Sequence, residues 1–230
     1  MPRLYIIAGC NGSGKTTASY TVLPELLECS EWVNSDEFAK SLSPFKPESA
    51  AIMASRYMLL KTRMLFRDRK DFAIETTLAT RSLLKMVMAA QRQGYFVELL
   101  YLWLPTPEMA VERIRARVAA GGHNIDEETV RRRYYTGLSY LFNDYMNTCD
   151  KWTMADNSTP PFKLIAEGSA TMATIHDWAA FRELRELVPK GQYDTIRRRS
   201  PSEFVPREVL EKTPDAHDGV PAPQTNGNWK

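Results

Sequence analysis

Short apolar runs alternate with longer amphipathic segments along most of the chain. The runs are rich in β-branched and aromatic residues and have the length of buried strands. We expect strands at Leu4–Ala8, Glu31–Asn34, Phe72–Thr76, Tyr95–Leu104, Trp152–Ala155 and Lys163–Ala166. Because strands that alternate with helices are joined by crossover connections, the pattern predicts an α/β fold. It would be a three-layer sandwich whose mainly parallel sheet, of about five to six strands, carries helices on both faces.

The segments between these runs have the apolar period and the end signals of helices. We expect helices from Lys15 to about Glu28 with a restart at Pro24, and at Pro47–Arg69, Arg81–Gln93, Pro107–Ala119 and from Asp126 to about Tyr145. In the long segment 47–69 the period predicts one core-facing stripe. Its members are Ile52, Leu59 or Leu60, and Leu65 or Phe66.

The end of the chain departs from this pattern. Six prolines follow Leu187 among polar residues, and apolar runs are few. This composition predicts a Pro-rich, loosely ordered tail over residues 189–230, after a single domain over residues 1–188.

Composition narrows the class of protein. A net charge of +2 disfavours a protein that mainly grips nucleic acid or an anionic membrane. The three cysteines are scattered without metal-ligand spacing, and no apolar stretch approaches membrane-spanning length. These features predict a cytoplasmic protein with no membrane partner.

The segment after the first strand matches G-x-x-x-x-G-K-[ST], from Gly9 to Thr16. A chance match in a chain of this length is on the order of one in a hundred. Backbone N–H groups of such a loop converge on phosphate oxygens, Lys15 reaches the β- and γ-phosphates, and the Thr16 hydroxyl helps hold Mg²⁺. The motif therefore predicts binding of ATP and Mg²⁺. The expected nucleotide contacts are Gly9, Asn11, Gly12, Ser13, Gly14, Lys15, Thr16 and Thr17.

Two further strand ends carry carboxylates, and parallel strands present these ends at the same sheet edge. Asp36 follows the second strand, where it would accept the proton of an attacking hydroxyl, support the magnesium ion or cap the next helix. Glu75 and Thr77 end the third strand and would contact the acceptor, unless Glu75 is held by structural hydrogen bonds.

Arginines flank a glycine pair further along the chain. Arg113 and Arg117 share a helix face before Gly121-Gly122, and Arg132 and Arg133 follow it. A lid over about 117–133 that closes on the transferring phosphate would neutralise its charge. A solvated basic face is the alternative reading.

Two polar residues near the expected site have more than one reading. His123 would contact phosphate or substrate, or stabilise the lid through a hydrogen bond. Asn157 would meet the adenine edge of ATP or only turn the chain. No apolar run ends in Asp in the manner of a motor ATPase, which favours a small kinase.

In combination these motifs resemble the zeta-toxin-like P-loop kinases, in the compact bacterial branch described as predicted ATPases. The resemblance covers about residues 3–168. It rests on GCNGSGKTT at 9–17, NSDEFA at 34–39, ETTL at 75–78, RVAAGGHNI at 117–125, RRRY at 131–134 and DNS at 156–158. Glu-Thr-Thr stands where the toxins have Glu-Gly-Thr, and the tail has no counterpart.

The resemblance implies a kinase that phosphorylates a nucleotide-activated amino sugar such as UDP-N-acetylglucosamine. It also implies Asp36 as the base, Glu75 and Thr77 at the acceptor, and Arg117 with Arg132 or Arg133 on the phosphates. A separate antitoxin protein would be a partner. The alternatives are an antibiotic or metabolite phosphotransferase and a nucleotide-binding regulatory ATPase with weak hydrolysis. A nucleic-acid-directed enzyme is disfavoured because the aromatics are not set among arginines.

Overall fold

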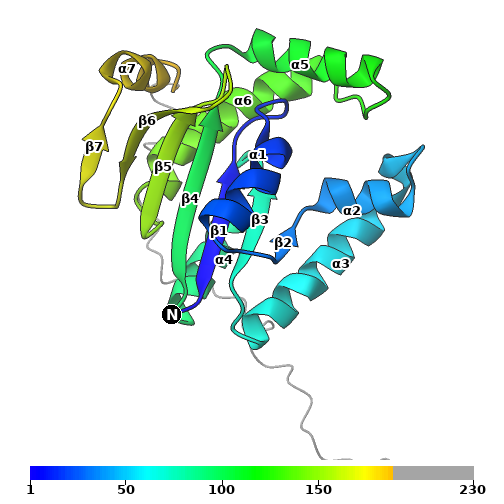
Figure 1. Cartoon of the computed structure of the whole chain (residues 1–230), viewed down its shortest axis with the longest axis horizontal. Helices are drawn as coiled ribbons and strands as arrows, with labels where there is room; N and C mark the ends of the chain where they lie inside the picture. The colour runs from blue at the N-terminus through cyan, green and yellow to red at the C-terminus, as the bar shows by residue number, and fades with distance from the viewer. Residues whose placement is uncertain (189–230) are drawn as a thin grey trace, which may run out of the picture. The chain divides into compact units, whose positions relative to one another are not determined.

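The computed structural model describes residues 1–188, and the expected tail lies outside them. A sheet with the order β2-β3-β1-β4-β5-β6-β7 forms the middle of the domain (Figure 1). The strands are β1 Arg3–Ala8, β2 Trp32–Val33, β3 Phe72–Thr76, β4 Phe96–Trp103, β5 Lys151–Asp156, β6 Lys163–Gly168 and β7 Ala173–Ile175. The helices are α1 Lys15–Thr21, α2 Ser35–Leu42, α3 Pro47–Arg67, α4 Ser82–Arg92, α5 Pro107–Ala119, α6 Glu127–Tyr140 and α7 Trp178–Glu186. Single π-helical turns, η1 Val22–Leu26 and η2 Leu141–Tyr145, continue α1 and α6.

The strand that carries the phosphate loop is central in the sheet. Strand β1 pairs in parallel with β3 on one side and with β4 on the other, and β2 and β5 extend the parallel part. In the β1–β3 register Ile7 lies opposite Glu75, so the end of β3 lies beside the start of the phosphate loop. Strand β6 pairs in antiparallel orientation with β5, and β7 pairs in antiparallel orientation with β6. The mainly parallel α/β prediction is therefore confirmed.

Alternate residues of β1 point to two separate cores, as expected for a sheet covered on both faces. Leu4, Ile6 and Ala8 belong to the large core with buried side chains of α3, α4, α5, α6 and α7. Tyr5 and Ile7 pack with Leu23 of η1 in a smaller core. Helices on both sides of β1 thus hold its carboxyl end, and the loop after it, in a fixed position.

Three elements of the structure were not predicted. Strand β7, which makes the sheet seven-stranded instead of five- to six-stranded, was missed because it is only three residues long and too exposed to form an apolar run. Helix α2 was missed because its eight residues bury only Ala39. Helix α7 was missed for the same reason, since only Leu184 is buried.

The predicted core face of α3 was also largely wrong. Ile52, Leu59 and Leu60 are exposed. The buried face is formed instead by Ala50, Ala54, Met58, Thr62 and Leu65. Both sets satisfy a helical period, so the pattern alone does not choose between them. The small side chains Ala50 and Ala54 pack with Ala39 of α2 and allow the two helices to approach closely.

Among the described residues, no helix combines the length and the apolar character needed to cross a membrane.

Candidate functional site

The phosphate loop has a backbone that only glycine permits at key positions. Gly12 and Gly14 have φ values of 80° and 84°. A Cβ at Gly12 would lie 2.6 Å from the carbonyl oxygen of Ala110, and one at Gly14 would lie 2.5 Å from Nδ2 of Asn157. These close contacts fix the loop between β1 and α1, so that its N–H groups can converge on an anion.

Lys15 is buried at the first position of α1. Its Nζ donates a hydrogen bond to the carbonyl oxygen of Cys10, at 2.8 Å. Burial lowers the pKa of this ammonium group, while the nearby charge of Glu75 opposes that shift. The lysine is thus held inside the loop at the place where the motif predicts phosphate.

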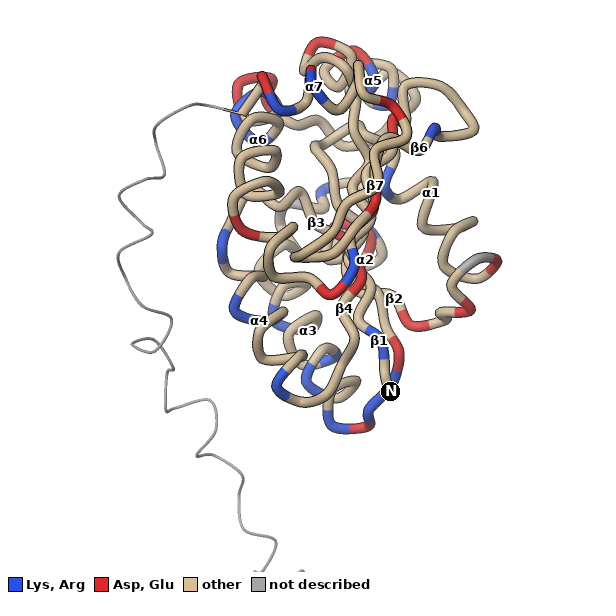
Figure 2. Tube along the Cα trace, turned by 90° about the vertical axis from the view of Figure 1, so that its left-hand side faces the viewer, with Lys and Arg blue, Asp and Glu red and all other residues tan. Residues whose placement is uncertain are grey.

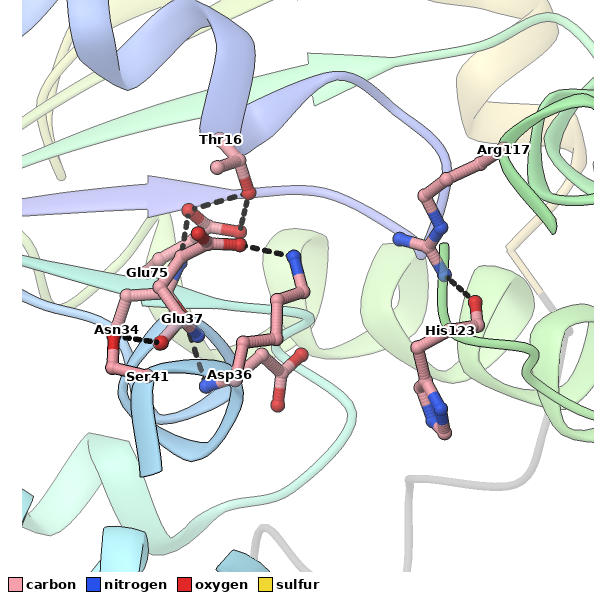
Figure 3. A network of polar contacts seen from close by, with 9 residues as sticks. Thr16, Asn34, Asp36, Glu37, Ser41, Glu75, Arg117 and His123 are labelled. Carbon is pink, nitrogen blue, oxygen red and sulfur yellow. Dashed lines mark hydrogen bonds and ion pairs between the residues drawn. The ribbon is translucent and has the colours of Figure 1, made fainter. Parts of the chain in front are cut away.

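Thr16 and Glu75 are joined directly (Figure 3). The Thr16 hydroxyl lies 3.0 and 3.1 Å from the two carboxylate oxygens of Glu75. Burial raises the pKa of Glu75, although Lys15 and hydrogen bonds from Thr16 and Asn34 lower it. The structure places this Glu near the carboxyl end of β3, the strand beside β1.

Asn34 links this carboxylate to α2 (Figure 3). Its Nδ2 donates to Oε2 of Glu75 at 2.8 Å, and its Oδ1 accepts from the backbone N–H groups of Asp36 and Glu37 at 2.9 and 3.1 Å. Asn34 therefore caps α2, and the reading of Asp36 as that cap is wrong. The Asp36 side chain is exposed in the first turn of the helix. A polar residue directly before a helix with acids in its first turn is the signal that would have found Asn34.

A cleft of about 680 Å³ brings most of the predicted site residues together. Those that line it are Asn11, Gly12, Gly14, Lys15, Thr16, Thr17, Asp36, Glu75, Thr77, Arg117, His123 and Arg133. Gly9, Ser13, Arg132 and Asn157 do not line it. Glu37 and Lys40, which form an ion pair on α2, also line the cleft and were missed by sequence reasoning.

The predicted lid arginines have different surroundings. Arg133 Nη1 donates to Oδ1 of Asn11 in the phosphate loop at 3.1 Å. Arg117 Nη2 donates to the carbonyl oxygen of His123 at 2.8 Å, across the turn after α5 (Figure 3). Arg132 is exposed and lies outside the cleft. The structure therefore brings Arg117 and Arg133 to the site and leaves Arg132 out.

Asn157 contacts the phosphate loop, and Arg113, which lines the cleft, holds the backbone at Asn157. Asn157 Nδ2 donates to the carbonyl oxygen of Ser13 at 2.7 Å. Arg113 Nη2 in turn donates to the carbonyl oxygens of Asn157 and Ser158, at 2.9 and 2.7 Å. The amide of Asn157 is thus engaged by the loop backbone, a role that neither sequence reading included.

Comparison with known proteins places these features in a family. The chain is 32% identical over 126 residues to an uncharacterized protein of Haemophilus influenzae, a match that covers 55% of this chain and 88% of that protein. A crystal structure of AvrRxo1-ORF1:AvrRxo1-ORF2 with ATP has a TM-score of 0.63 at 15% identity, and it covers 84% of this chain and 65% of the matched one. The chain thus spans slightly less than two thirds of that protein.

A structure of the PezAT chromosomal toxin-antitoxin system of Streptococcus pneumoniae has a TM-score of 0.58 at 15% identity, over 86% of this chain and 82% of that chain. These structural likenesses indicate a shared P-loop kinase-like fold. The family model described as AAA domain matches residues 4–134, which is more than half of the chain. The protein therefore belongs to this AAA domain family, AAA_33.

Proposed function

We propose that the protein is an ATP- and Mg²⁺-dependent kinase that transfers the γ-phosphate to a hydroxyl of a small acceptor. The observation that carries the proposal is the meeting of Lys15, Asp36 and Arg133 in one cleft. A phosphate anchor, a free carboxylate and a second cation are the groups that phosphoryl transfer to a hydroxyl requires.

The donor set beside the loop fits a magnesium ion. Mg²⁺ prefers oxygen ligands and is usually held by one or two protein groups together with water and substrate phosphates. The Thr16 hydroxyl and the Glu75 carboxylate supply such oxygens side by side. The described residues contain no group of three His, Cys, Asp or Glu that would form an all-protein cage. When bound, the ion would neutralise the charge of the phosphates.

Each residue of the cleft would have a separate role in phosphoryl transfer. Lys15 would hold the β- and γ-phosphates, and Arg117 and Arg133 would meet the charge that spreads over the transferred group. The Asp36 carboxylate would take the proton of the attacking hydroxyl, because it is exposed in the cleft and not used as a cap. In this division Glu75 serves the metal side of the site, while Thr77 and His123 are left for the acceptor.

Sequence motifs favour a zeta-toxin-like acceptor, a nucleotide-activated amino sugar such as UDP-N-acetylglucosamine. The neighbours described as AvrRxo1-ORF1:AvrRxo1-ORF2 and PezAT are complexes or toxin-antitoxin systems. A separate antitoxin is accordingly our proposed partner. An antibiotic or metabolite kinase would use the same phosphate machinery with other acceptor contacts.

Phosphate transfer from labelled ATP tests the proposal. The full chain is incubated with Mg²⁺, labelled ATP, and either UDP-N-acetylglucosamine or a bacterial metabolite extract. We expect a new labelled species with the wild type, and a loss of roughly 10²–10⁴-fold with Asp36→Asn while ATP binding remains. ATP consumption without any labelled acceptor would favour the regulatory ATPase instead. Loss of Mg²⁺-dependent binding in Asp36→Asn would assign this carboxylate to the metal.

A further inference from the structure

Helix α3 has an apolar stripe that the fold of this domain does not use. Its buried face, centred on Ala54 and Met58, already packs in the core. About 110° round the helix from that face, at 100° per residue, lies a second row of large apolar side chains. They are Met53, Tyr57, Leu60 and Met64, which are 63%, 46%, 56% and 55% exposed. Large apolar side chains gathered on one exposed strip mark an interaction surface.

The spacing of this row is that of a helix-pairing seam. Its members follow one another at four, three and four residues, which is the a/d pattern of a heptad. Tyr57 is also held in place, because its ring stacks on Phe38 of α2 with centroids 4.2 Å apart and planes inclined by 7°. A fixed aromatic side chain loses little conformational entropy on binding and suits the centre of an interface. The row is therefore shaped to receive another helix.

The charged side chains beside the row indicate which kind of partner helix would bind there. Arg56 and Arg63 are exposed along one flank of the row, and basic positions recur along α3 in Figure 2. From residue 49 to residue 67 the sequence contains Arg56, Lys61, Arg63 and Arg67 but no Asp or Glu. Lys61 pairs with Glu31 and Arg67 with Asp68. Among the side chains that the structure describes, no ion pair engages Arg56 or Arg63.

We propose that Met53, Tyr57, Leu60 and Met64, with Arg56 and Arg63, form a docking surface for an acidic amphipathic helix of a partner protein. We name this the α3 outer surface. The occupant would place apolar residues at heptad spacing on the row and carboxylates beside the two arginines. This inference does not depend on kinase activity.

Two other occupants fit the surface less well. A second copy paired about a two-fold axis would bring the same surface against itself, so cations would face cations, and residues 49–67 contain no carboxylate to separate them. An anionic membrane would satisfy the arginines. However, helices that lie in a membrane interface separate a basic face from an apolar face, whereas Arg56 and Arg63 lie between the row and the exposed side chains of Ile52 and Leu59.

A pair of fluorescent helical peptides, each about three heptads long, provides the probe. Both carry leucine at the a and d positions, and they differ only in glutamate or lysine at the flanking positions. Binding to the full chain is followed by fluorescence anisotropy. We expect the glutamate peptide to bind on the order of tenfold more tightly than the lysine peptide, with a difference that shrinks as salt is added.

Variants locate the binding. Leu60→Asp should weaken the glutamate peptide by on the order of tenfold or more. The double variant Arg56→Glu with Arg63→Glu should reverse the preference between the peptides. Met172→Asp changes a side chain that is 75% exposed elsewhere in the domain and should leave binding unchanged. Unchanged far-UV circular dichroism and melting temperature would show that each variant is folded.

Several results would overturn the proposal. They include no binding of either peptide, equal binding of both, or an equal loss in Met172→Asp and Leu60→Asp. A dimer in sedimentation that Leu60→Asp dissociates would assign the surface to a second copy of the chain. Binding to anionic phospholipid vesicles that Leu60→Asp abolishes, without competition by the glutamate peptide, would assign it to a membrane.

Discussion

Replacement of Glu75 by Gln separates the two roles that sequence and geometry give this residue. The carboxylate accepts from the Thr16 hydroxyl and from the Asn34 amide. Glutamine keeps the size of the side chain and one carbonyl oxygen, so it retains part of this network but removes the charge. Loss of a side chain that supports a bound metal typically lowers the metal affinity by about 10- to 100-fold. If Glu75 supports the metal, the Mg²⁺-dependent part of ATP affinity should therefore fall by roughly 10- to 100-fold, at about 1.4 kcal/mol per factor of ten.

Calorimetric titration of a non-hydrolysable ATP analogue, with and without Mg²⁺, measures this difference. Glu37→Gln is the matched control, because Glu37 also lines the cleft but pairs with Lys40 on α2. It should leave the Mg²⁺ effect within about twofold, because Glu37 forms a partly exposed ion pair within α2 and makes no hydrogen bond with Thr16. Equal Mg²⁺ effects in wild type and Glu75→Gln would refute the metal role. A loss confined to transfer onto the acceptor would return Glu75 to the substrate side.

The remaining predictions use the same protein and related assays. Arg133→Ala should lower turnover by on the order of 10³-fold with little change in ATP affinity, while its exposed neighbour Arg132→Ala should stay near wild type; equal losses in rate and affinity would indicate a simple phosphate anchor. Asn157→Ala should weaken ATP and GTP alike by roughly 3- to 10-fold, since a neutral hydrogen bond contributes about 1 kcal/mol; a loss confined to ATP would support an adenine contact. Burial raises the pKa of Glu75 above its ordinary value of 4.5, so the folded state keeps this proton to higher pH than the unfolded chain. From about pH 4.5 upward, the free energy of unfolding of the nucleotide-free protein should accordingly fall as pH rises, and urea titrations should show a flatter fall for Glu75→Gln.

Local signals carried most of what the sequence predicted correctly. The glycines and Lys15 of the phosphate loop act through backbone geometry and charge within a few residues, and that information is complete in the motif. The runs at Phe72–Thr76 and Pro107–Ala119 matched β3 and α5 at both ends, because apolar period and end residues agree there. Such elements need no knowledge of what lies beside them.

Features that depend on neighbours were not predictable in the same way. Glu75 lies at the Thr16 hydroxyl because β3 is next to β1 in the sheet. The order of strands in a sheet cannot be predicted from a local sequence pattern. The amide of Asn157 finds its partner 144 residues away in the sequence. In α3 two apolar sets compete at the same period, and only the close approach of α2 decides which one is buried. In each case, tertiary packing determined which of several arrangements compatible with the sequence pattern was formed.

The phosphate loop has a consequence for the order of folding during synthesis. The motif ends at Thr16, but the residues that contact the loop are synthesised much later. Ala110 lies close to Gly12, Arg133 donates a hydrogen bond to Asn11, and Asn157 donates one to the carbonyl oxygen of Ser13. Contacts of such long sequence separation form only after the intervening chain is available. A nascent chain shorter than about 157 residues would therefore lack a finished nucleotide site, and ribosome-bound fragments of increasing length should gain ATP binding late and abruptly. The nucleotide site of such a chain would be complete only once residues up to about Asn157 had been translated.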